Sequence, residues 1–194
     1  MKEPGFISIR LQPTELVLLI PEETPVENID FEVSPDAAIP PALDVRVAQI
    51  KFDQALDFFP PEIGRIPLHR YVAQKIEAIP GRKGRLKDWL QAFGLAPHTD
   101  MPVADLPLQA HFRLQMLIAL SEQHGVIALS NATFIESLSD LLWHIKGFCL
   151  KLKNPLVQAA WVLIEEELTP PLVFSMERIL EIEAGVVEEI GIDF

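Results

Sequence analysis

Proline is the residue that most constrains how this chain can fold, because nine of its 17 prolines lie within residues 1–61. Each proline removes a backbone hydrogen-bond donor and disfavours helical geometry at the residue before it. The sequence therefore argues against long helices in this region. Three short apolar segments predict β-strands there instead, over residues 6–11, 16–20 and 26–33.

Beyond residue 66 the spacing of apolar residues becomes helical. The clearest segment is 131–152, where apolar residues recur at intervals of three or four and so share one helix face. Residues 45–59 suit either a strand or a short helix. The predicted helices cover residues 68–79, 84–95, 108–124, 131–152, 155–168 and 175–190.

These patterns predict a mainly α protein of the α+β kind, with a small N-terminal β-rich region followed by a helical bundle of about five or six helices. We divide the chain into residues 1–61, a proline-rich region of strands and loops, and residues 62–194, the helical bundle domain. The first region either stands alone or packs on the bundle. A chain of 194 residues can bury a core without disulfides or metals.

The lone cysteine, Cys149, excludes an internal disulfide and fits a reducing compartment. No apolar segment approaches the roughly 20 residues that a membrane-spanning helix needs. We therefore expect a soluble protein in the cytoplasm.

Charge is distributed unevenly along the chain, whose net charge is −12. Residues 65–87 hold seven of the 16 basic side chains and a single acidic one. This stretch is either an anion site on the turn at 80–85, a surface that pairs with the acidic ends of this or another copy, or a solvated loop. Its candidate anion- or partner-binding residues are Arg65, Arg70, Lys75, Arg82, Lys83, Arg85 and Lys87.

A second set of candidates is expected to contact a protein partner. Trp143 lies off the apolar face of the helix predicted over 131–152, and tryptophan is enriched at binding hot spots. The C-terminal segment mixes acidic and apolar residues, among them Glu188, Glu189 and Phe194. As an amphipathic helix it would dock into a basic-rimmed groove, although an ordinary last helix of the bundle would show the same pattern.

Motifs that carry catalysis or hold cofactors are missing from the sequence. It has no glycine-rich phosphate loop, no zinc-ligand spacing and no nucleophile elbow. His98 and Asp100 place a base near a carboxylate, but no nucleophile accompanies them. Glu136 and His144 lie eight residues apart, about 12 Å along a helix, so one ion cannot bind both. We therefore predict no catalytic residue, no metal site and no cofactor.

The leading functional hypothesis is a protein–protein interaction module, such as an adaptor, an assembly factor or a regulatory subunit, that binds a protein partner or a second copy of itself. The first alternative is a nucleic-acid-associated subunit that uses residues 65–87 on phosphates. It would act only within a larger complex, because the chain as a whole is acidic. The second alternative is an enzyme whose catalytic residues are scattered along the chain and leave no local motif.

Overall fold

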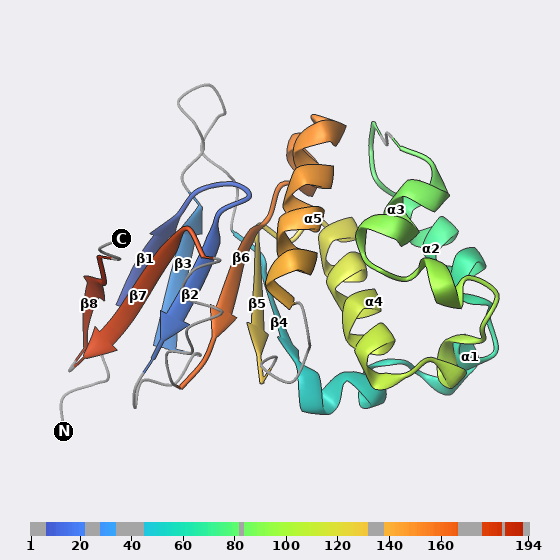
Figure 1. Cartoon of the computed structure of the whole chain (residues 1–194), viewed down its shortest axis with the longest axis horizontal. Coiled ribbons are helices and arrows are strands. Elements are labelled where there is room, and N and C mark those ends of the chain that lie inside the picture. The colour runs from blue at the N-terminus through green and yellow to red at the C-terminus, as the bar shows by residue number, and fades with distance from the viewer. Residues whose placement is uncertain are drawn as a thin grey trace.

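A six-stranded β-sheet separates a helical side of the molecule from a side that is covered by a second, two-stranded sheet (Figure 1). The computed structural model describes residues 7–21, 28–33, 45–81, 84–131, 138–166, 176–183 and 185–191. The strands are β1 (Ile7–Leu11), β2 (Leu16–Ile20), β3 (Ile29–Val33), β4 (Val47–Lys51), β5 (Val126–Ser130), β6 (Ala160–Ile164), β7 (Arg178–Glu183) and β8 (Val186–Glu189).

The helices gather on one side of the large sheet (Figure 1). Helices α4 and α5 lie nearer the sheet, and α1, α2 and α3 lie outside them. The α-helices are α1 (Pro61–Gly64), α2 (Leu68–Glu77), α3 (Leu86–Ala92), α4 (Leu108–Ser121) and α5 (Leu138–Leu152). Short 3₁₀ helices are η2 (Phe52–Phe58), η3 (Ala96–His98), η4 (Val103–Asp105) and η5 (Pro155–Val157).

The order of strands in the large sheet is β4-β5-β6-β2-β7-β8, and all neighbours are parallel except β7 and β8. Crossovers between parallel strands are right-handed, so their direction across the sheet decides which face they cover. The connections from β4 to β5 and from β5 to β6 cross the sheet toward β8, and their helices α4 and α5 lie on one face. The connection from β2 to β4 runs the other way, and its strand β3 lies on the opposite face, parallel to β1.

Strand β2 is buried on both faces, as expected for a central strand of a parallel sheet. Its residues Leu16, Leu18 and Ile20 join the core on the helical side. The residues between them, Val17 and Leu19, face β1 and β3. Both faces of the sheet are therefore shielded from solvent at this strand.

The prediction of a mainly α protein built around a helical bundle is wrong. The structure is an α/β fold with a six-stranded sheet, and two segments predicted as helices contain strands. Residues 155–168 contain η5 and β6, and residues 175–190 contain the antiparallel pair β7 and β8. Strand β6 is apolar and buried throughout, so its sequence carries no alternation that separates a strand from a buried helix.

The division at residue 61 stays a prediction. Strands β2 and β4 come from the first predicted region, and they pair with β5, β6 and β7 from the second.

The strands predicted over 6–11, 16–20 and 26–33 correspond to β1, β2 and β3. Within the described ranges no helix has the length and apolar character to span a membrane.

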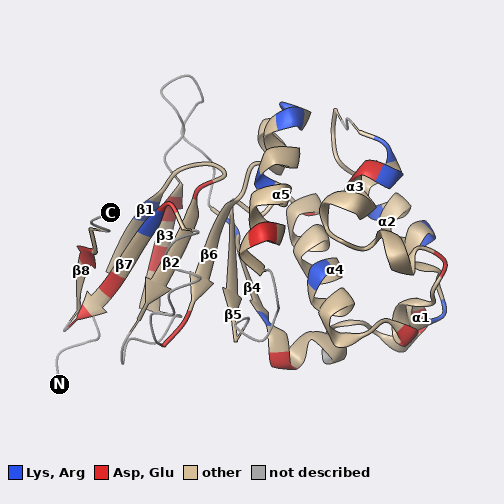
Figure 2. Cartoon of the chain, viewed as in Figure 1, with Lys and Arg blue, Asp and Glu red and all other residues tan. Residues whose placement is uncertain are grey.

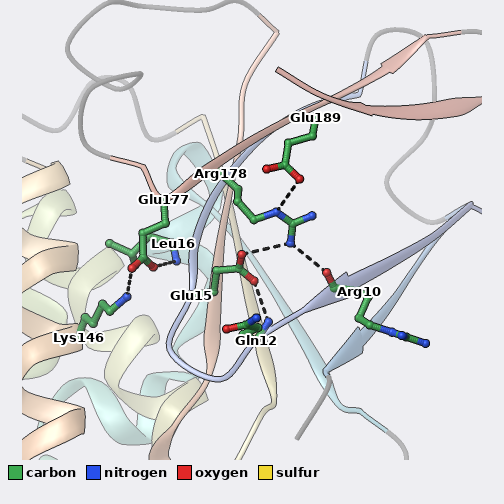
Figure 3. A network of polar contacts seen from close by, with 8 residues as sticks. All are labelled: Arg10, Gln12, Glu15, Leu16, Lys146, Glu177, Arg178 and Glu189. Atoms are coloured by element: carbon green, nitrogen blue, oxygen red, sulfur yellow. Dashed lines mark hydrogen bonds and ion pairs between the residues drawn. The ribbon is translucent and has the colours of Figure 1, made fainter. Parts of the chain in front are cut away.

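An ionic network joins the start of β7 to the two-stranded sheet (Figure 3). The guanidinium of Arg178 donates through Nη1 to the carbonyl oxygen of Arg10 and to Oε1 of Glu15, both at 3.1 Å. Its Nε donates to Oε2 of Glu189 at 3.3 Å. Glu15 is largely buried, and its other oxygen accepts from the backbone of Gln12 at 2.7 Å. The network thus links β1, β2, β7 and β8 on the side away from the helices.

Candidate functional site

The described residues form a cleft of about 740 Å³ between α3 and α5. From the α3 side it is lined by Gly84, Asp88 and Gln91. From the α5 side it is lined by residues that include an aromatic ring and a cation, among them Trp143, His144, Gly147 and Lys151. An open apolar cleft with a few polar groups is the usual form of a small-molecule site.

Packing between α3 and α5 fixes the shape of the cleft. Trp89 of α3 is buried and meets the ring of Phe148 edge-on, with ring centres 5.0 Å apart. Gly84 precedes α3 with a φ of +90°, and a Cβ there would lie 3.2 Å from Cδ2 of Leu152. The turn into α3 therefore needs glycine, both for its backbone conformation and for its close approach to α5.

One face of α5 presents three cleft-lining residues at successive turns. Trp143, Gly147 and Lys151 are four residues apart, so they lie in one row, and the row spans about 12 Å. A Cβ added to Gly147 would meet no atom within 4 Å. The row therefore offers an aromatic ring at one end, an open gap in the middle and a cation at the other end.

The polar groups beside this row are held in place by the backbone and the sheet. Lys146 lies over the ring of Trp143, 5.2 Å from its centre, and forms an ion pair with Glu177 (Figure 3). The second oxygen of Glu177 accepts from the backbone N–H of Leu16 at 2.9 Å, which ties this pair to β2. Nδ1 of His144 donates to the carbonyl oxygen of Asp140 at 2.7 Å, which leaves Nε2 as the other ring nitrogen for a ligand.

One residue that the sequence singles out lines the cleft, and two others lie near it without lining it. Trp143 lines it with its side chain 44% exposed, and Arg85 and Lys87 lie at the start of the adjacent helix α3. Figure 2 shows the cationic residues on α3 and at the end of α5. Lys151 was missed by the sequence analysis, because its nearness to α3 depends on the packing of the two helices. Within the described residues Lys151 forms no ion pair.

The rest of the predicted basic surface is dispersed. Arg65 follows α1, and Arg70 lies on α2. Lys75 donates to Oε1 of Glu122 at 2.8 Å and lies over the ring of Tyr71, so it is engaged within the chain. Two further members of the predicted set, Arg82 and Lys83, fall outside the described residues.

The C-terminal candidates do not lie on an amphipathic helix. Glu188 and Glu189 belong to β8, and Glu189 pairs with Arg178. Phe194 falls outside the described residues. The interpretation of this segment as an acidic helix is wrong, because its residues pair with β7 in an antiparallel ladder.

The histidine and carboxylate candidates do not form a catalytic or metal-binding group in the described part of the chain. Asp100 lies 3.4 Å from Nδ1 of His69, not beside His98 as a base–carboxylate pair. The same nitrogen of His69 lies 3.0 Å from the carbonyl oxygen of Thr99. Among the residues that the structure describes, no three histidines, cysteines or carboxylates are close enough to share a metal ion.

Comparison with known proteins shows the fold. No family model matches the sequence, and no curated protein matches it either. An ATP-binding cassette of an ABC transporter, solved in its ADP conformation, superimposes with a TM-score of 0.51 at 9% identity, covering 91% of this chain and 79% of that chain. A metal-chelate type ABC transporter in an inward-facing conformation gives 0.46 at 11% identity over 92% and 72%. The first of these likenesses agrees with the α/β fold of this chain.

This fold corrects the leading functional hypothesis. The interaction module was inferred from segregated charge and missing catalytic motifs in a mostly helical chain, whereas the structure is an α/β fold that resembles a solved ATP-binding cassette. The hypotheses of an adaptor, an assembly factor or a regulatory subunit are wrong for the same reason.

The expected place for a nucleotide in an open α/β sheet is the carboxyl edge at the point where connections diverge to opposite faces. In this sheet that point lies between β2 and β6. P-loop proteins place a glycine-rich loop, its lysine and a helix after the first of these strands, and an aspartate on a neighbouring strand binds Mg²⁺. These features can be compared directly with the residues present.

The carboxyl edge does not fit an ATP phosphate group. The sequence has no glycine between Gly5 and Gly64, and the next described element after β2 is the strand β3, not a helix. Strand β5 ends in Ser130, and the Asn131 that follows donates to Asp53 at 3.3 Å. The residue after β6 is a glutamate, Glu165. We therefore derive no hydrolysis step at this edge.

Proposed function

We propose that this protein binds a nucleotide in the cleft between α3 and α5, with the base against Trp143 and the phosphates toward Lys151. The observation that carries the proposal is the row of Trp143, Gly147 and Lys151 along one face of α5. A nucleotide has the same layout, because its sugar separates an aromatic base from its anionic phosphates.

The aromatic end of the row suits a base. Stacking of a base on an aromatic side chain contributes about 1–3 kcal/mol and tolerates any base. Trp143 is 44% exposed, and Phe148, five residues further along α5, also lines the cleft. Lys146, which pairs with Glu177, lies over the ring of Trp143 and holds it in place.

The other end of the row suits phosphate. Lys151 is exposed and without an ion-pair partner among the described residues, and an ammonium group binds phosphate as a compact charge. Asp88 and Gln91 of α3 line the same cleft, and Oδ2 of Asp88 also accepts from the backbone N–H of Arg85 at 3.0 Å. A carboxylate and an amide are suitable partners for ribose hydroxyls.

The proposal covers binding and leaves out hydrolysis, in keeping with the misfit at the carboxyl edge. We also propose that the protein acts in the cytoplasm, as its composition predicts. The solved neighbour is part of an ABC transporter, so transporter components are the first protein partners to test.

Titration with AMP, ADP and ATP, followed by calorimetry and by tryptophan fluorescence, tests the proposal. Trp89 and Trp161 are buried, so a ligand in the cleft should change mainly the emission of Trp143. We expect saturable binding that is lost in Gly147→Phe, which fills the gap, and at least tenfold weaker in Lys151→Glu. The matched control is Lys153→Glu, an exposed residue that does not line the cleft.

Three results would contradict the proposal. The first is the absence of saturable binding by all three nucleotides. The second is equal affinity of the Lys151→Glu and Lys153→Glu variants. The third is release of phosphate from ATP by the wild-type protein and by Gly147→Phe alike, which would place nucleotide chemistry at the carboxyl edge of the sheet.

A further inference from the structure

A second cavity, of about 720 Å³, lies on the other side of the helical layer and is independent of the proposed nucleotide cleft. It is bounded by η2, α1, η4 and the start of α4. Most of its lining is apolar, from Phe59 and from prolines that include Pro60 and Pro102. Its charged or titratable lining residues are Arg65, Asp105 and His111.

The backbone holds the segments that carry the two charged residues next to each other in the cavity wall. Residues Pro67 and Pro102 form an isolated antiparallel bridge, and the backbone N–H of Val103 donates to the carbonyl oxygen of Ile66 at 3.0 Å. These contacts join the segment after α1, which carries Arg65, to η4, which ends in Asp105.

Arg65 and Asp105 are both exposed, and neither side chain forms an ion pair or hydrogen bond with any residue that the structure describes. They do not pair with each other, although their charges are opposite and they line one cavity. A ligand that carries both charges would satisfy both side chains at once. A ligand with a single charge would pair with one and be repelled by the other.

His111 forms a buried part of the same wall. It is 3% exposed, its ring packs against Phe59 with centres 5.4 Å apart, and its Nδ1 has no hydrogen-bond partner in the described part of the chain. Burial lowers the pKa of His111 below its ordinary value, so the imidazole is neutral at pH 7. Because Nδ1 is itself buried, it does not face the open space of the cavity, and His111 contributes to the shape of the wall.

We infer that this cavity binds a small zwitterion with an apolar side chain, of the class of free aliphatic or aromatic α-amino acids. The carboxylate pairs with Arg65, the ammonium group pairs with Asp105, and the side chain contacts Phe59 and the prolines. Two observations indicate this class of ligand. The cavity has two side chains of opposite charge that are unpaired among the described residues, and most of its wall is apolar.

The test compares L-phenylalanine and L-leucine with 3-phenylpropionate and 2-phenylethylamine, which keep the ring but carry one charge each. Binding is measured by calorimetry and by saturation-transfer NMR. We expect at least one amino acid to bind saturably and at least tenfold more tightly than either single-charge analogue. Arg65→Gln and Asp105→Asn should each weaken that binding tenfold or more.

The control variant is Arg70→Gln, which removes an exposed cation that does not line the cavity and should bind like the wild type. Thermal unfolding should be unchanged in all three variants, because the three side chains are exposed. The inference is overturned if neither amino acid binds at millimolar concentration, if a single-charge analogue binds as tightly, or if Arg65→Gln and Asp105→Asn bind like Arg70→Gln.

Discussion

Both faces of the six-stranded sheet are shielded from solvent, but the layers that cover them are very different. One face packs against α4 and α5, with α2 and α3 outside them, and the other packs against two strands of five residues each. Both cavities described above lie among the helices. The comparison indicates that the sheet and its β-strand cover form the rigid support, whereas the helical layer forms the candidate ligand sites.

The polar contacts at the start of β7 follow the same division (Figure 3). Glu177 faces the helical side and binds Lys146 of α5. The next residue, Arg178, faces the other side and binds Glu15 and the carbonyl oxygen of Arg10. Consecutive residues of a strand point to opposite faces. Glu177 and Arg178 therefore connect the start of β7 to both layers that cover the sheet.

The largest expected effect compares two neighbouring leucines of β2. Leu18 faces the helices and Leu19 faces β1 and β3, and both are fully buried. We expect Leu18→Ala to lower the free energy of unfolding by about 3–5 kcal/mol and Leu19→Ala by about 2–3 kcal/mol. The difference arises because two short strands can move into a cavity more easily than a multi-helix layer can.

Urea denaturation of both variants measures this difference. Equal losses, or a larger loss in Leu19→Ala, would show that the two-stranded sheet is held as rigidly as the helices. In that case the division between a support and a ligand-binding layer would not hold.

A smaller effect is expected from the two ionic anchors. Arg178→Met leaves the buried carboxylate of Glu15 without its guanidinium partner, and we expect a loss of about 2–3 kcal/mol. Lys146→Met leaves Glu177 partly exposed and still bonded to the backbone of Leu16, so its loss should be about 1 kcal/mol or less. Thermal denaturation at low and high salt compares the two, and adding Glu15→Gln to Arg178→Met should recover part of the larger loss.

The sequence predicts the elements whose patterns are local. Strands β1 and β3 alternate apolar and polar residues, and α2 and α4 begin at residues that follow prolines, so these elements are found close to their predicted places. Strands β5 and β6 are missed because they are buried on both faces and carry no alternation. The pairing of β6 with β2 joins residues more than a hundred positions apart, and local periodicity cannot indicate it.

The candidate sites show the same limit. The sequence singles out Trp143, because this residue lies off the apolar face of its own helix. It does not indicate Lys151 as a partner of that ring, nor that Arg65 shares a cavity with Asp105, since both depend on how helices pack. One of the three interpretations of residues 65–87, pairing with the acidic ends of this or another copy, stays a prediction, and one of its residues, Lys75, pairs with Glu122.

A pH experiment tests whether water reaches the core on the helical side of the sheet. Burial raises the pKa of the Cys149 thiol to about 12, from an ordinary value of 9.0. The folded state therefore keeps this proton more tightly than the unfolded state. Its contribution to stability is complete below pH 9 and is lost as the pH rises toward the folded pKa.

We expect the free energy of unfolding to fall by about 1 kcal/mol more in the wild type than in Cys149→Ala between about pH 8.5 and 10. The comparison with the variant cancels the titration of groups that both proteins share, such as Tyr71. Parallel pH profiles for the two proteins would mean that water reaches Cys149 in the folded state.

The smallest effect concerns Gly147, which lies on the cleft side of α5, two residues before the buried Cys149. A Cβ at this position would meet no atom within 4 Å, and glycine inside a helix costs about 0.5–1 kcal/mol relative to alanine. Gly147→Ala should therefore raise the free energy of unfolding by that amount in a urea titration. Gly84→Ala is the opposing control, because its φ of +90° and its contact with Leu152 make the same methyl group destabilising. If Gly147→Ala stabilises the fold but weakens nucleotide binding, the methyl group occupies space that the ligand needs, and the effect on binding is separated from any effect on folding.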